Sequence, residues 1–104
     1  MANVPLSSET RSRLEALFDP SEQAEAEQLL VELCGSNLPF CEDSDATSLE
    51  RIRFAALKVS GGRLAELYSA VDLANVDWRD LLVAADFAQD VEAHKAWVPG
   101  RPAV

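Results

Sequence analysis

The sequence predicts an all-α fold, an irregular bundle of five to six short helices in a single domain. No run of alternating apolar and polar residues between turn residues indicates a β-strand. Alanine, leucine and glutamate dominate the apolar segments, and these residue types favour helix. Apolar positions also recur at spacings of three and four, and helix-start signals precede several of these segments.

The first two helices are predicted from their capping residues. Ser7 or Ser8 can cap a helix that runs to about Leu17. A second helix should run from Pro20 to about Cys34, where Gly35 ends it. We expect the Asp19 side chain to accept hydrogen bonds from the first amides of this helix, with a capping box completed by Glu22. The buried side of the first helix should hold Leu14, Leu17 and Phe18.

The second half of the chain predicts helices separated by glycine and acidic turns. A capping box that begins at Thr47 opens a helix to about Val59, which Gly61 and Gly62 terminate. A fourth helix should cover residues 63–74, and a fifth should begin at a cap formed by Asp77. The expected buried residues of these two helices are Leu64, Leu67, Tyr68, Val71, Leu81, Leu82, Ala84 and Ala85.

A short sixth helix should span residues 90–97. The domain is then predicted to comprise residues 1–97, with residues 98–104 as a flexible tail that proline and glycine keep out of a helix. Residues 35–46 form the one long predicted loop, and whether Cys34 and Cys41 form a disulfide stays open.

The net charge of −9 lies entirely in the first half of the chain. Residues 1–50 hold eleven acids and two arginines, whereas residues 51–104 hold seven charges of each sign. An acidic surface repels nucleic acid and favours a basic protein partner. The alternative is that the acids only keep the protein soluble. The residues expected to bind such a partner are Glu22, Glu25, Glu27, Glu32, Glu42, Asp43 and Asp45.

Several other site types fail on their spacing or charge. The run from Asp43 begins like a calcium loop, but Ser48 and Phe54 stand where glycine and glutamate are required. Two cysteines without a Cys-x-x-Cys pair do not indicate zinc, so we expect no metal and no cofactor. The helices on either side of Gly61 and Gly62 resemble a helix-turn-helix, with Arg51, Arg53, Lys58 and Arg63 as its cations.

Nucleic-acid binding is nonetheless disfavoured, because the second of those helices begins with Arg63 as its one cation and carries Glu66 and Asp72. The longest aliphatic run has five residues, far from the roughly 20 that cross a bilayer. The N-terminus lacks a secretory signal pattern. We therefore expect a cytoplasmic protein that does not span a membrane.

A second hypothesis places a pocket near His94. Histidine is the residue that titrates closest to neutral pH, and Asp90 lies on the same predicted helical face. The pocket would also include Trp78, Arg79 and Trp97, which makes a small enzyme or ligand-binding domain the alternative function. Trp78 and Arg79 can anchor an interface, but a structural role at a helix start is the favoured interpretation.

The stretches Arg-Ile-Arg-Phe-Ala-Ala-Leu-Lys, Asp-Trp-Arg-Asp-Leu-Leu-Val-Ala-Ala and His-Lys-Ala-Trp, within residues 50–97, resemble a group of small bacterial all-helical proteins without a known activity. This resemblance implies a bacterial cytoplasmic setting and no reaction. The sequence thus predicts a non-enzymatic, immunity- or inhibitor-like protein that binds a basic partner. Its oligomeric state and the identity of its partner stay open.

Overall fold

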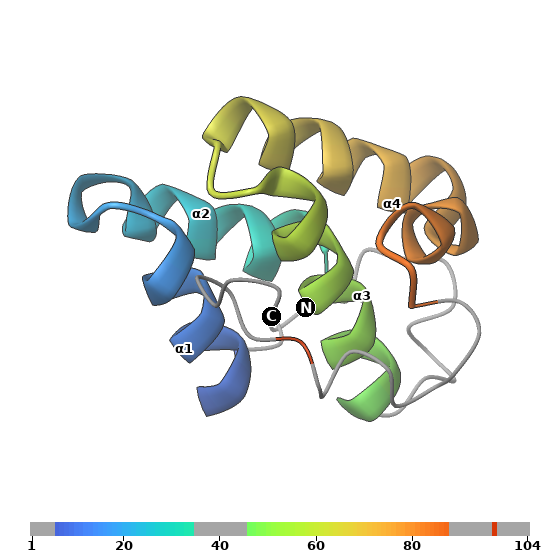
Figure 1. Ribbon diagram of the computed structural model, residues 1–104, viewed down its shortest axis with the longest axis horizontal. Helices are drawn as coiled ribbons and strands as arrows, with labels where there is room; N and C mark the ends of the chain where they lie inside the picture. Colours follow the sequence, from blue (N-terminus) through green and yellow to red (C-terminus); the bar gives the residue numbers. More distant parts are fainter. Residues whose placement is uncertain (1–5, 35–45, 88–96, 98–104) are drawn as a thin grey trace, which may run out of the picture.

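Four helices make up the part of the chain that the computed structural model describes, namely residues 6–34, 46–87 and 97 (Figure 1). They are α1 (Ser8–Leu17), α2 (Pro20–Leu33), α3 (Ala46–Ser60) and α4 (Leu64–Ala84), and these described residues contain no strand. The all-α prediction is confirmed, but the predicted count of five to six helices is not. The predicted helices on either side of Asp77 are the two segments of α4, which a non-helical residue at Asp77 separates, and residues 90–96 of the predicted sixth helix lie outside the description.

The start of α1 is capped as predicted, whereas the start of α2 is not. Ser7 Oγ accepts a hydrogen bond from the Thr10 amide at 3.1 Å. The Asp19 side chain makes no capping hydrogen bond, so that prediction is wrong. Instead, the Asp19 carbonyl oxygen accepts from the amides of Glu22 at 2.8 Å and Gln23 at 3.1 Å. Backbone groups close this first turn, and the exposed Asp19 carboxylate stays in solvent.

The turn between α3 and α4 is built from two glycines in the left-handed region. Gly61 has a φ of +60° and Gly62 a φ of +86°, which side chains with a Cβ rarely adopt. The Ser60 hydroxyl donates to the Leu57 carbonyl at 2.6 Å and accepts from the Gly62 amide at 3.2 Å. The predicted termination of α3 is confirmed. Its start differs, because α3 begins at Ala46 and Thr47 therefore lies inside the helix.

A break at Asp77 divides α4 into two segments. Asp77 has a φ of −157° and a ψ of 99°, and its Oδ1 accepts from the Arg79 amide at 3.0 Å. This hydrogen bond is the predicted cap, and it lies at the start of the second helical segment of α4. The Arg79 guanidinium also lies 3.6 Å from the same carboxylate.

The main helix contacts form a cycle: α1 packs on α2, α2 on α4, α4 on α3, and α3 on α1 (Figure 1). Their inner faces share one hydrophobic core, in which Leu30, Leu57, Leu67 and Leu81 have no exposed surface. Two predicted core residues lie outside it: Ala84 is exposed, and Tyr68 keeps 48% of its surface accessible. The tyrosine turns outward because its hydroxyl donates to Glu25 of α2 at 2.6 Å.

Candidate functional site

An aromatic cluster joins the end of the described chain to α3. Trp97 lies with its ring centroid 6.1 Å from Phe54 and 6.3 Å from Phe87. Phe54 and Phe87 are buried, and Trp97 packs partly buried against the core. The Arg13 guanidinium lies 4.4 Å from the centre of the Phe54 ring, and Lys58 Nζ lies 4.8 Å from that of Phe87. Both cations can therefore make cation–π interactions with the cluster.

Arginines around this cluster donate to backbone carbonyl groups. Arg13 Nε donates to the Trp97 carbonyl at 3.0 Å, Arg51 donates to the Phe87 carbonyl, and Arg53 Nε donates to the Cys34 carbonyl at 2.9 Å. Arg53 is only 2% exposed. Arg53 is therefore buried and Arg51 half-buried, with the guanidinium of each donating to a backbone carbonyl group.

The second predicted site is described only in part. Trp78 packs partly buried against the core, with the Arg79 guanidinium 5.8 Å from the centre of its ring. Trp97 belongs to the aromatic cluster. Asp90 and His94 lie outside the described residues, so the predicted pocket around the histidine stays a prediction.

The four predicted acids of α2 differ in their contacts. Glu27 accepts two hydrogen bonds from the Arg11 guanidinium, at 2.7 and 2.8 Å, and this pairing lowers the pKa of its carboxyl group. Glu25 accepts from the Tyr68 hydroxyl, which raises the pKa of that phenol. Glu32 is exposed and Glu22 is half-buried. The remaining predicted acids, Glu42, Asp43 and Asp45, lie outside the described residues.

A groove runs along α2 on the side that faces α4. It has a volume of about 630 Å³ and is lined by Ser21, Ala24, Glu25, Gln28, Leu29, Glu32, Leu33 and Tyr68. A second hollow of about 370 Å³ shares Ala24, Gln28 and Glu32 with it. The groove therefore combines two of the predicted partner-binding acids with apolar side chains. We call it the α2–α4 groove.

The apolar part of the α2–α4 groove was not predicted from the sequence. Tyr68 was expected in the core, but 48% of its surface is exposed, and the apolar Leu33 is 45% exposed. One signal was available: Ser21, Glu25, Gln28 and Glu32 recur at spacings of four, three and four, which places these polar residues on one side of α2. Which element lies beside them is not encoded in that spacing.

Cys34 is a buried thiol at the end of α2. It has no exposed surface, and its burial raises the pKa of the thiol to about 12. The reactive thiolate is therefore strongly disfavoured at neutral pH. Within residues 6–34, 46–87 and 97, no three His, Cys, Asp or Glu side chains come together as a possible metal site. No helix in these same ranges has the length and apolarity needed to cross a membrane.

We predict that Cys34 resists alkylation in the folded protein. In a Cys41→Ser variant, iodoacetamide at pH 8 should modify Cys34 at least about a hundredfold more slowly in native buffer than in denaturant, since exposure of the thiol requires unfolding. Mass spectrometry of timed samples measures the two rates. Comparable rates in both buffers would show that the thiol is accessible in the folded state.

The buried thiol also predicts how stability depends on pH. Its folded pKa is raised above the ordinary value of 9.0, so its contribution is fully present below pH 9. The contribution is then lost as the pH rises toward about 12, because the unfolded chain ionises first.

Comparison of the chain with protein families, with curated proteins and with solved structures found no match to any of them.

Proposed function

We propose that this protein is a non-enzymatic interaction protein whose α2 surface binds a basic protein partner. The proposal rests on the contacts that several of the described cations make inside the protein. Arg13, Arg51, Arg53 and Lys58 contact carbonyl groups or aromatic rings near the core. Of these four cations Arg53 is buried and the other three are half-buried, whereas most of the described carboxylates are exposed.

The carboxylates of α2 are available to a partner to different degrees. Glu25 and Glu32 are exposed and line the α2–α4 groove, and Glu22 lies near its beginning on α2. Glu27 is already paired with Arg11 and contributes less. Opposed charge on two proteins speeds their encounter and helps to select the correct partner. A cytoplasmic setting, with ionic strength near physiological, leaves such steering effective over about 8 Å.

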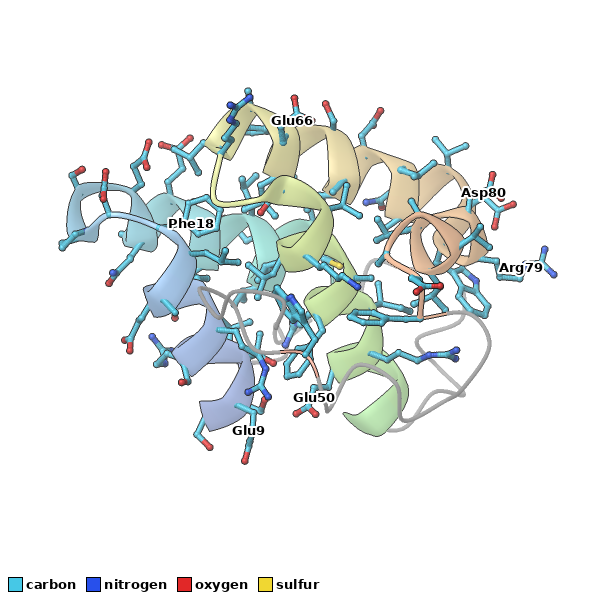
Figure 2. All side chains as sticks on the ribbon, in the orientation of Figure 1. Glu9, Phe18, Glu50, Glu66, Arg79 and Asp80 are labelled. Atoms are coloured by element: carbon cyan, nitrogen blue, oxygen red, sulfur yellow. The ribbon has the colours of Figure 1, made fainter. Side chains whose placement is uncertain are left out.

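Acidic side chains also lie away from α2. In Figure 2, Glu9 and Glu66 lie on opposite sides of the molecule, and Asp80 lies near the break of α4. Net charge alone could therefore attract a basic protein without any specific surface. Variants that lose the same number of acids at different positions distinguish a specific α2 surface from an effect of net charge.

Affinity capture with two matched variants makes that distinction. One variant carries Glu22→Gln, Glu25→Gln and Glu32→Gln, and the control carries Glu9→Gln, Asp80→Asn and Asp86→Asn, so both lose three negative charges. Each is used as bait in a cytoplasmic extract at low salt, and the captured protein is identified and purified. We expect the α2 variant to lose the partner, whereas the control retains it.

The association rate of the purified partner is then measured by stopped flow at two salt concentrations. We expect wild-type association to slow by at least about tenfold from low to high salt, because screening removes the steering. If both triple variants lose the partner equally, net charge alone explains the binding, and the α2 surface is not the specific site. An association rate independent of salt would likewise remove the proposal.

A further inference from the structure

The α2–α4 groove has the length of a short helix. Seven of its eight lining residues come from α2, between Ser21 and Leu33. At 1.5 Å per residue, this stretch is about 18 Å long, or a little over three helical turns. Tyr68 of α4 forms the facing wall, and α2 and α4 run side by side where they pack (Figure 1). A straight helical ligand of about twelve residues matches this length.

The two ends of the groove differ in side-chain size. Ser21 and Ala24 are small, so they allow a ligand to approach the α2 backbone closely at one end. Leu33 lies at the other end, whereas Tyr68 lies nearer the first, since its hydroxyl donates to Glu25 at 2.6 Å; both side chains are large and nearly half exposed. Burying apolar surface of this kind contributes about 25 cal/mol per Å². The exposed leucine and tyrosine therefore suit apolar side chains of a partner.

Two carboxylates border these apolar residues. Glu25 and Glu32 are seven residues apart on α2, so they lie on the same face, about 10 Å apart along the helix axis. Cations seven residues apart on a parallel or antiparallel helix have the same spacing. Glu25 already accepts from the Tyr68 hydroxyl, but a guanidinium offers two donors and full charge, which makes a stronger bond to a carboxylate.

We propose that the α2–α4 groove binds a basic amphipathic helix of a partner protein, whose apolar residues contact Leu33 and Tyr68 while its lysines or arginines pair with Glu25 and Glu32. This inference rests on the proposed function and specifies the partner's form. A groove of this kind binds a helix through apolar side chains that lie three, four and seven residues apart on that helix. A second copy of this chain is disfavoured as the occupant, because each copy has a net charge of −9.

The test uses a defined peptide with the full-length protein. The probe is a fluorescent, end-blocked synthetic helix of about fourteen residues, with leucines at i, i+3, i+4 and i+7 and arginines beside them. A control peptide has the same composition, in an order that scatters the leucines around the helix. Anisotropy gives both affinities, and we expect the amphipathic order to bind at least about tenfold more tightly.

Protein variants then locate the bound peptide. Tyr68→Ala removes the wall and should weaken binding about tenfold, whereas Tyr68→Phe keeps the ring and should hold affinity within about twofold. Leu33→Ala should weaken binding about fivefold. The double variant Glu25→Gln, Glu32→Gln should weaken binding at low salt by at least the same factor. Glu9→Gln with Asp80→Asn removes the same charge elsewhere and should change affinity less than about twofold. Melting curves for all variants confirm that each is folded.

The outcomes separate this inference from the proposed function. Equal binding of both peptides, or an unchanged affinity for Tyr68→Ala, overturns the groove as the binding site while leaving a salt-dependent acidic surface intact. An absence of saturable binding to the amphipathic peptide also overturns it. Binding without a gain in the peptide's helical circular dichroism shows an extended ligand and contradicts the helix. Loss of salt dependence for the captured partner overturns the proposed function itself.

Discussion

Arg53→Ala is expected to lower the free energy of unfolding by roughly 3–5 kcal/mol. The arginine side chain is 2% exposed, and its Nε donates to the Cys34 carbonyl at 2.9 Å, which ties α3 to the end of α2. Alanine would leave a cavity and remove a donor from a buried carbonyl group. A small domain has only about 5–15 kcal/mol of stability to lose, so this variant should be partly unfolded at 37 °C.

Urea unfolding followed by far-ultraviolet circular dichroism measures the loss. Arg63→Ala is the matched control, because Arg63 is exposed at the cap of α4 and its removal should change stability by no more than about 0.5 kcal/mol. Arg53→Met separates the two causes, since methionine restores part of the volume without a donor. We expect it to fall between wild type and Arg53→Ala. A loss for Arg53→Ala no greater than that for Arg63→Ala would contradict this account.

Gly62→Ala is expected to destabilise the fold by about 2–5 kcal/mol, because two penalties coincide. Gly62 has a φ of +86°, and a Cβ placed on it would lie 2.6 Å from the Leu17 carbonyl oxygen. That neighbour is backbone at the end of α1, so relief requires the α3–α4 turn to move away from α1. The same urea titration measures the effect.

Gly61→Ala is the natural control for Gly62→Ala. Gly61 has a φ of +60°, but no atom lies within 4 Å of its added Cβ. Its substitution should therefore cost only the conformational strain, about 1–2 kcal/mol. The difference between the two variants isolates the close approach to Leu17. Equal losses would show that the turn relaxes without disturbing α1.

The helix boundaries illustrate what local sequence signals can predict. Ser7 caps α1, Gly61 and Gly62 terminate α3, and Asp77 caps the second segment of α4, all as expected. Each signal acts within about four residues, so the chain near it contains the whole cause. The Asp19 cap is the exception, since the backbone alone closes the first turn of α2.

Burial was harder to predict than the helices themselves. Arginine is seldom buried and nothing in the sequence marks Arg53 as an exception, yet it lies inside and donates to the Cys34 carbonyl. Tyr68 was assigned to the core from its helical spacing, yet it faces α2 and contacts Glu25. Spacing gives the side of a helix on which a residue lies, and only the neighbouring helix decides whether that side is covered.

The sequence by itself determined the all-helical class, most of the helix boundaries and the acidic character of α2, because caps, glycines and charges act locally or simply add. The tertiary structure decided which cations turn inward, how Trp97 meets Phe54 and Phe87, and that Tyr68 lines a groove beside Glu25 and Glu32. These features join residues distant in the chain, and their positions depend on how whole helices pack against one another.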